Sequence, residues 1–229
     1  MLKIYGVPIS VHTRKVIVAA RLKQLSFELQ PVVPVIPDNP PANWRELSPT
    51  GKIPVLQDGD FTLADSAAIC AYLERKQPQP SLYPSQAKPY GQALWLEQYA
   101  GGTLFHDVVH PLFHEVFVHP KVRGIATDAA RVDRVLTGAL PDALGYLDKI
   151  AGAQFLAGPA LSVADLAVVS NLVTMHYIGF ALERTRFPRL ANLFDRVIRM
   201  PEVADVLRAE QPAVSQMGLK SEFLNAVLN

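Results

Sequence analysis

The sequence predicts an α/β region followed by an all-α region, and three observations support this prediction. Residues 1–76 alternate between strand-like and helical runs, in the order β-α-β and then β-β-α. The proline-rich segment QPQPSLYP then marks a linker. From Lys88 onward the pattern is helical only. We therefore expect a first domain at residues 1–77, a linker at 78–88 and a helical domain at 89–229.

The chain is expected to begin with a βαβ unit, in which two strands flank one helix: residues 2–5 (LKIY), 13–25 and 27–33. Such a unit packs right-handed in nearly all cases. On the helix, apolar residues such as Val16 and Ile17 are expected to be buried. The cationic residues between them are expected to face solvent: Arg14, Lys15, Arg21 and Lys23.

The next stretch contains four prolines within residues 34–43 and predicts an irregular excursion, with one helical turn at 44–47. Residues 48–72 (SPTGKIPVLQDGDFTLADSAAICAY) then predict a hairpin that leads into a helix ending near Lys76. Asp58-Gly59 is a strong hairpin-turn dipeptide between two short β-favouring runs. The helix after the hairpin begins at a typical capping position.

Pro54 stands directly before the first strand of this hairpin, where it removes a backbone donor. If its peptide bond is cis, the strand edge at Ile53 stays open and could pair with an extended ligand. Asp65 and Ser66 would then lie nearby, at the start of the helix. This arrangement suits a small peptide, with Ser66 and helix N–H groups holding a carboxylate and Asp65 an ammonium group. An ordinary turn followed by a capped helix is the alternative.

The helical half is expected to open with a long helix at residues 90–118, broken or kinked near Pro111. Apolar residues then recur at helical spacing, with a bend at Pro141: Ile125, Ala129, Val132, Leu136, Leu140, Leu144 and Leu147.

Ser162 and Asp165 resemble a capping box, and Leu161 stands in the staple position before it. The helix that follows is apolar almost all round, which is typical of a core helix. Pro188 and Pro201 each open a further helix, and residues from 211 onward form a weakly specified tail.

Composition excludes several classes of protein. The 22 Lys and Arg nearly balance the 21 Asp and Glu, so a nucleic-acid or anionic-membrane surface is not indicated. Cys70 is the only cysteine, which rules out an intrachain disulfide and a thiolate metal cluster. No apolar run reaches membrane-spanning length, and the N-terminus lacks a signal-peptide profile. A cytoplasmic protein is expected.

Three motifs, in their order and separation, resemble those of the cytosolic glutathione transferases: SPTGKIPVL at 48–56, LADSAAI at 63–69 and FLAGPALSVADL at 155–166. The segment YGVPISVHTRKV at 5–16 looks most like the serine-using phi and theta-like classes. The resemblance implies a thioredoxin-like N-terminal domain that binds glutathione. It also implies an all-helical C-terminal domain that supplies the wall for a hydrophobic electrophile, a homodimer, and transfer of glutathione to that electrophile.

Carried over residue by residue, the resemblance assigns a role to each residue of the expected site. Ser10 matches the serine whose hydroxyl donates a hydrogen bond to the glutathione sulfur. Ile53 matches the residue whose backbone pairs with the cysteinyl unit, and Pro54 matches the cis-proline. Asp65 and Ser66 match the acidic-serine pair that holds the γ-glutamyl end. Ser162 and Asp165 match a capping box with a role in folding.

The physics agrees with the role assigned to Ser10. A free thiol with a pKa near 8.5 is only a few per cent thiolate at neutral pH. A hydrogen bond to a charged group contributes roughly 1.5–3 kcal/mol, or about one to two pKa units. The N-terminal end of the first helix adds a favourable field. Tyr5 is the rival for this contact, because other classes use a tyrosine there; His12 and Thr13 are further candidates to assist.

One departure concerns the glycyl carboxylate of glutathione. The phi-like pattern has a His-Lys pair where this chain has Asn39 and Pro40, which supply no cation. Lys52 is therefore the expected ligand of that carboxylate, helped by Arg14 or Arg45.

Three histidines recur every four residues on the first long helix: His106, His110 and His114. Histidines at this spacing can ligate zinc. The favoured interpretation is that this face, with Phe113 and Phe117, lines the electrophile pocket or a dimer groove, and no metal is expected. Cys70 is expected to be buried packing.

Two alternatives to a transferase remain open. A glutathione-dependent isomerase or peroxidase would use the same scaffold, and a non-catalytic member would serve as a binding module. A glutaredoxin-like reductase is not expected, because it would need a cysteine where Ser10 stands.

Overall fold

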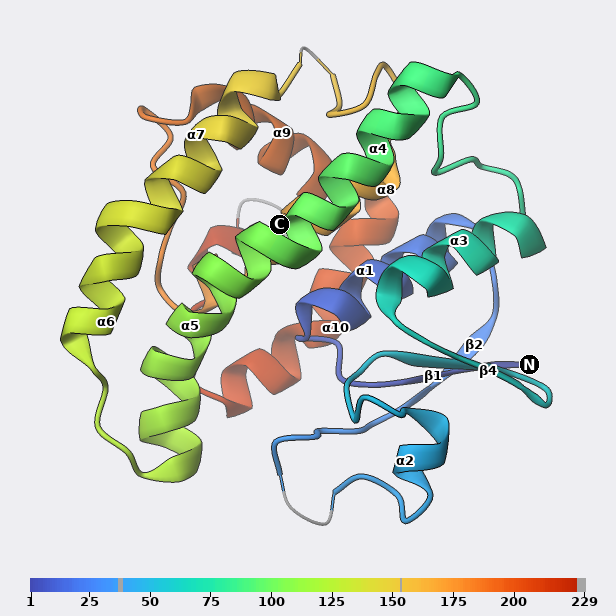
Figure 1. Ribbon diagram of the computed structural model, residues 1–229, viewed down its shortest axis with the longest axis horizontal. Helices are drawn as coiled ribbons and strands as arrows, with labels where there is room; N and C mark the ends of the chain where they lie inside the picture. The colour runs from blue at the N-terminus through green and yellow to red at the C-terminus, as the bar shows by residue number, and fades with distance from the viewer. Residues whose placement is uncertain (37–38, 153, 226–229) are drawn as a thin grey trace.

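The N-terminal part of the chain forms a four-stranded sheet in the order β2-β1-β3-β4 (Figure 1). The computed structural model describes residues 1–36, 39–152 and 154–225. The strands are β1 (Leu2–Tyr5), β2 (Phe27–Gln30), β3 (Val55–Asp58) and β4 (Phe61–Ala64). β1 is parallel to β2 and antiparallel to β3, and β3 is antiparallel to β4. The predicted βαβ unit and hairpin are confirmed, although the second strand ends three residues earlier than expected.

Helices cover both faces of this sheet. α1 (Val11–Leu22) and α3 (Ser66–Lys76) lie on one side, and the single-turn α2 (Trp44–Leu47) lies on the other (Figure 1). On the α2 side, the buried Trp44 packs with Val32 and Val55 in a small core of its own. The larger core lies on the α1 side and continues into the helical domain.

The strand register brings three distant segments to one edge of the sheet. Tyr5 at the end of β1 pairs with Val55 at the start of β3, and Val55 pairs with Ala64 at the end of β4. The loop after β1, the residues before β3 and the residues after β4 therefore all emerge at the same edge. These segments contain Ser10, the Ile53–Pro54 pair and Asp65–Ser66 respectively.

The helical domain opens with a helical run from Ala87 to Arg123, longer than the predicted 90–118. It consists of α4 (Ala87–Tyr99), η1 (Ala100–Val109), α5 (His110–Phe113) and η2 (His114–Arg123), where η1 and η2 have the wider π-helical hydrogen bonding. Pro111 lies inside this continuous run, at the change from η1 to α5, so the helix is not broken there. The run ends at Gly124, which adopts the left-handed conformation.

The next helical stretch begins later than the apolar pattern predicted. It consists of α6 (Ala129–Arg134), η3 (Val135–Ala139) and α7 (Leu140–Ile150), with Pro141 in the first turn of α7. The inclusion of Ile125 in this pattern was wrong. Ile125 lies in the connection before α6 and is 50% exposed, so its apolar side chain does not belong to the buried face.

The last helices are α8 (Val163–Tyr177), α9 (Pro188–Ile198), α10 (Pro201–Gln216) and the short η4 (Glu222–Leu224). The capping box of Ser162 and Asp165 is confirmed, and α8 is buried almost all round. The prediction of a weakly specified tail from residue 211 was wrong, since α10 continues to Gln216. The buried Val214 anchors this final part of the helix to the core.

The first helix joins the two domains through charged side chains that the sequence pattern assigned to solvent. Arg14 and Lys15 are buried and pair with Glu210 of α10 and Glu97 of α4, each at 2.7 Å. Lys23 is also buried and donates to the carbonyl of Gln77 at 2.8 Å. The prediction that these three cations face solvent was therefore wrong, because each has a partner brought in by the fold.

None of the described helices has the length and apolar character that crossing a membrane requires.

Candidate functional site

Ser10 lies at the start of α1 and acts as its N-cap. Its backbone is extended (φ −68°, ψ 129°), and its side-chain oxygen accepts a hydrogen bond from the N–H of Thr13 at 3.4 Å. A hydroxyl that accepts in this way keeps its own hydrogen for another partner. The 12-residue helix behind it directs its N-terminal partial positive charge toward the same place. Ser10 can therefore donate to an anion at this position.

Thr13 lies directly beneath the loop that carries Ser10. A Cβ atom added to Gly6 would come within 2.5 Å of the Thr13 Oγ1, so only glycine allows this close approach. Thr13 is fully buried, and its hydroxyl has no hydrogen-bond partner among the described residues. An unpaired buried hydroxyl is uncommon and is typical of functional regions.

Tyr5, the rival for the sulfur contact, is already engaged in the sheet. Its hydroxyl donates to the Gln57 Oε1 at 2.7 Å, and its ring lies 6.3 Å from that of Trp44. Its phenolic hydrogen is used by a side chain of β3. This arrangement favours a packing role for Tyr5.

The Ile53–Pro54 peptide bond is cis, as the resemblance implies. The carbonyl of Lys52 accepts a hydrogen bond from the Ser48 hydroxyl at 2.7 Å, which holds the turn before β3. Within the described part of the chain, the backbone N–H and C=O of Ile53 form no hydrogen bond. The backbone of Ile53 is thus available to pair with an extended ligand.

Asp65 adopts a backbone conformation that side chains rarely tolerate, with φ +83° and ψ 124°. Its Oδ1 caps α3 by accepting from the N–H groups of Ala67 at 2.8 Å and Ala68 at 3.1 Å. Both cap bonds use this one oxygen, so Oδ2 can accept from a further donor. Ser66 follows in the first turn of α3 and is 7% exposed. Strained backbone of this kind clusters at ligand-binding sites.

The three cationic side chains proposed for the glycyl carboxylate have different surroundings. Arg14 was a wrong candidate, because its guanidinium is buried and donates to both oxygens of Glu210 at 2.7 and 3.0 Å. Arg45 packs against Gly51, where an added Cβ would lie 2.8 Å from its guanidinium carbon. Lys52 is exposed next to Gly51. The guanidinium of Arg45, on α2, therefore lies against the turn that carries Lys52.

His12 connects this sheet edge to the helical domain. Its ring contacts that of Phe105 edge-on, with centroids 4.4 Å apart. The pKa of His12 is lowered to about 4. Burial is the main cause and the positive charge of Lys15 adds to it, whereas the negative charge of Asp65 opposes the shift. His12 is therefore neutral at pH 7. Phe105, which sequence reasoning missed, bridges from His12 to the histidines at 106 and 110; its only sequence signal is its place directly before His106.

The predicted histidine face exists as a row of adjacent rings. The centroids of His106 and His110 lie 6.3 Å apart, and those of His110 and His114 lie 4.3 Å apart. Phe113 and Phe117 stack on each other at 5.2 Å. The described residues contain no group of three or more His, Cys, Asp or Glu side chains arranged to hold a metal ion.

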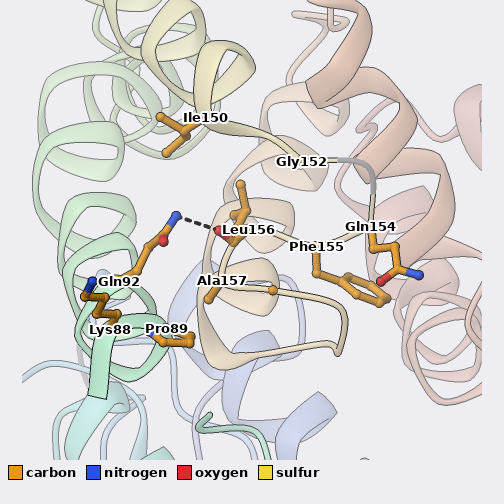
Figure 2. Close-up of a pocket in the computed structure, with 10 residues that line it drawn as sticks. Lys88, Pro89, Gln92, Ile150, Gly152, Gln154, Phe155, Leu156 and Ala157 are labelled. Atoms are coloured by element: carbon orange, nitrogen blue, oxygen red, sulfur yellow. Dashed lines mark hydrogen bonds between the residues drawn. The ribbon is translucent and has the colours of Figure 1, made fainter. Parts of the chain in front are cut away.

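A hollow lies elsewhere, at the N-terminal end of α4 (Figure 2). It has a volume of about 620 Å³ and lies between the first turn of α4 and the segment that follows α7. Gln92 crosses it and donates to the carbonyl of Leu156 at 2.8 Å. Among the described residues that line it, Lys88 is the only one with an ionisable side chain. These described residues bring no reactive groups together, so we assign the candidate site to the sheet edge instead.

Comparison with known protein families gives a match in both domains. The family model for the glutathione S-transferase N-terminal domain matches residues 4–81, and that for the C-terminal domain matches residues 106–210. Among curated relatives, human glutathione S-transferase theta-1 is 31% identical over 206 residues, covering 86% of this chain and 82% of its own length.

Two solved structures extend the comparison to the fold. A glutathione S-transferase from Rhodospirillum rubrum F11 has a TM-score of 0.81 at 26% identity, covering 90% of this chain and 92% of its own. A glutathione S-transferase I with bound lactoylglutathione has a TM-score of 0.75 at 25% identity, covering 90% of this chain and 97% of its own. Their similarity extends over both domains.

Proposed function

This chain belongs to the glutathione S-transferase family, and from this premise we propose that it transfers glutathione to a hydrophobic electrophile through a thiolate stabilised by Ser10. The observation that carries the proposal is the position of Ser10. It caps α1 at the sheet edge where the open backbone of Ile53 and the start of α3 also lie. A relative solved with lactoylglutathione supports the choice of ligand.

The sheet edge offers a matching group for each part of glutathione. The free backbone of Ile53, next to the cis Pro54, would pair with the cysteinyl unit. Ser66 and the N–H groups of the first turn of α3 would hold the γ-glutamyl carboxylate, and Oδ2 of Asp65 its ammonium group. Lys52 would hold the glycyl carboxylate.

Arg45 would assist Lys52, since its guanidinium packs against Gly51, the residue directly before Lys52. This pair replaces the His-Lys cations that the chain lacks. An isolated, exposed ion pair contributes little, about 0–1 kcal/mol, so we expect the affinity for glutathione to depend more on the groups at Ile53, Asp65 and Ser66.

Ser10 would stabilise the thiolate by donating its hydroxyl hydrogen to the sulfur. Its oxygen already accepts from Thr13, and this bond orients the hydroxyl. The dipole of α1 adds a favourable field for the anion. Ser10 keeps its proton throughout, and glutathione supplies the attacking sulfur. The helical domain holds the electrophile close to that sulfur, which lowers the entropic part of the barrier.

The assignment of domains and partners follows the same premise. We propose a glutathione-binding domain at residues 1–77, a linker at 78–88 and an electrophile-binding domain at 89–229, in a cytoplasmic homodimer that acts in detoxification. Exposed aromatic side chains support a dimer: Phe61 on β4 is 45% exposed, and Tyr90 and Trp95 on α4 are 43% and 55% exposed. Sedimentation should give twice the mass of the 25.1 kDa chain.

The decisive test is a pH titration of bound glutathione, with thiolate absorbance followed in the ultraviolet. We expect the wild-type protein to lower the thiol pKa by about one to two units, because one hydrogen bond to the anion contributes roughly that much. Ser10→Ala should return the pKa toward its free value. Tyr5→Phe is the matched control, since it also removes one hydroxyl but should leave the thiol pKa unchanged.

Three results would contradict this account in different ways. If Tyr5→Phe returned the thiol pKa to its free value, Tyr5 and not Ser10 would be the residue that stabilises the thiolate. A lowered thiol pKa without conjugate formation would favour the glutathione-dependent isomerase or peroxidase on the same scaffold. Glutathione that binds with an unshifted pKa, or does not bind, would identify a non-catalytic binding module.

A further inference from the structure

The histidine row (His106, His110 and His114) forms a continuous polar and aromatic surface on the helical domain. Its adjacent ring centroids lie 6.3 and 4.3 Å apart. His106 is exposed, and the other two are partly exposed. The row lies on η1, α5 and η2, where the helix changes between α- and π-type hydrogen bonding.

The histidine row reaches the candidate catalytic residue through one aromatic side chain. His12 lies two residues after Ser10 and contacts Phe105 at 4.4 Å. The ring of Phe105 lies 5.3 Å from His106 and 5.5 Å from His110. The surface therefore runs from the start of α1 outward along the helical domain. A molecule bound beside a sulfur at Ser10 would meet this row.

His110 and His114 are uncharged at neutral pH. Burial lowers the pKa of His110, with smaller contributions from His106, Arg131 and Lys52. Burial, together with His110, Arg123 and Arg131, lowers the pKa of His114 to about 4. Each ring therefore carries one N–H donor and no charge at pH 7.

A buried carboxylate on the same helical run, that of Glu115, is already paired. The side chain of Glu115 is only 2% exposed. Its Oε2 contacts the His119 Nδ1 at 3.1 Å and accepts from the N–H of Asp128 at 3.0 Å, while its Oε1 accepts from Arg131 at 3.2 Å. Glu115 thus orders the segment behind the row, and its charge is paired with that of Arg131.

Resting on the transferase function proposed above, we propose that the histidine row binds the second substrate and selects aromatic electrophiles that carry a carboxylate. A neutral imidazole retains one N–H donor, and a carboxylate accepts such donors strongly. The flat rings supply stacking area for an aromatic ring. A wholly apolar electrophile would desolvate these N–H groups without offering them an acceptor, which is unfavourable.

The reaction at this site can be written for a chloronitrobenzoate. The glutathione sulfur forms a bond to the ring carbon that carries chlorine, and chloride leaves with the electron pair of the broken carbon–chlorine bond. The proton of the thiol passes to solvent when the thiolate forms. The carboxylate takes no part in bond making and serves only for recognition by the row.

The test compares this chloronitrobenzoate with the matching chloronitrobenzamide, which has the same ring and leaving group but no charge. Values of kcat/KM are divided by the rate of each compound with free glutathione, which removes intrinsic reactivity. We expect the wild-type protein to favour the acid by about tenfold to a hundredfold, as one hydrogen bond to a charged group contributes roughly this factor. This comparison needs no variant.

Substitutions then assign the preference to the row. His110→Phe keeps an aromatic ring and removes the N–H. It should therefore abolish most of the preference for the acid over the amide. Only the activity with the acid should fall. His110→Gln restores a donor and should recover part of it. Asp107→Asn is the control: it lies on the same helical run, and its charge acts on Tyr99. The control should leave the preference unchanged.

The outcomes separate this inference from the proposed function. Turnover of both compounds at equal corrected rates, or a preference that survives His110→Phe, would overturn the inference and leave the transferase function intact. Failure to turn over either compound, together with an unshifted thiol pKa in bound glutathione, would overturn the proposed function and the inference with it.

Discussion

The sheet-edge site and the histidine row are built in different ways. At the sheet edge, backbone groups and short side chains do most of the work: the N-cap at Ser10, the open backbone at Ile53 and the strained turn at Asp65. The histidine row consists of long side chains on one helical run. Backbone geometry is fixed by the fold, whereas side chains on a helix change without altering its path.

This difference explains why the family resemblance informs one region more than the other. Glutathione is common to the family, and the site proposed for it uses elements that the fold itself supplies. The second substrate would meet side chains of the helical domain, whose identity the fold does not determine. The two regions are joined through α1, whose Ser10 faces the sheet edge and whose Arg14 is bound to the helical domain.

The largest effect is expected when Arg14→Ala removes the main polar contact between α1 and the helical domain. Arg14 donates to both oxygens of Glu210, to the carbonyl of Ser170 at 2.8 Å and to that of Ile9 at 3.1 Å. The substitution leaves the Glu210 carboxylate buried without its partner. The free energy of unfolding should fall by about 3–5 kcal/mol, measured by urea denaturation.

Arg21→Ala is the matched control, because Arg21 lies on the same helix but is exposed. Its cost should stay near 0.5 kcal/mol. Since the carbonyl of Ile9 directly precedes Ser10, the Arg14 variant should also raise the thiol pKa of bound glutathione. Equal stability of the two variants would show that the buried pair does not hold the domains together.

The second prediction concerns the loss of stability in acid, which should arise mainly in the helical domain. Burial lowers the pKa of His176 to about 4, while the unfolded value is near 6.5. The unfolded state therefore binds more protons between these values, and stability falls as pH decreases from about 6.5 to about 4. Full protonation would cost up to about 3 kcal/mol.

The His176 ring stacks on Phe194 at 4.9 Å, within the core of the helical domain. An NMR titration of this ring gives its pKa directly, and urea denaturation at several pH values gives the loss of stability. His176→Phe should reduce the pH dependence in this window and leave the contributions of His12 and His114, whose pKa values are also lowered to about 4. A measured pKa near 6.5 for His176 would refute the explanation.

The smallest effect separates two roles of Asp65 at the sheet edge. Asparagine also tolerates a positive φ and can accept the cap hydrogen bonds through its carbonyl oxygen. Asp65→Asn should therefore change the free energy of unfolding by less than about 0.5 kcal/mol. Its affinity for glutathione should fall about tenfold, because the ammonium group loses its charged partner. Calorimetric titration measures this loss, and unchanged affinity would leave Asp65 with a capping role only.

Much of the sheet-edge region could be predicted from sequence because its signals are local. The Asp58-Gly59 turn, the proline before β3 and the cap at Asp65 each act within a few residues. The secondary structure around them follows directly, and the register of the strands then brings the segments together. The engagement of Tyr5 by Gln57 became visible only once that register was known.

The buried charges of α1 could not be predicted in this way. Arg14 pairs with Glu210, which is 196 residues away, and Lys15 with Glu97, which is 82 residues away. Helical periodicity assigns an unpaired cation to solvent, because burying it alone would be costly. Only the assembled fold supplies the partner that makes burial possible.

The histidine row lies between these two cases. Its spacing was evident from sequence, but its charge environment was not, since Arg131 and Lys52 approach it from other segments. The zinc site that the same spacing suggested finds no support among the described side chains. Spacing alone predicted the row, and the fold determined its chemical character.

The central claim is that the sheet edge activates the sulfur while the histidine row selects its target. A double-mutant cycle of Ser10→Ala and His110→Phe, measured as kcat/KM with the chloronitrobenzoate, tests this separation most directly. We predict that the two effects add, with a coupling energy below about 0.5 kcal/mol. A coupling energy of about 1 kcal/mol or more would show that the two regions act as one unit and would contradict the account.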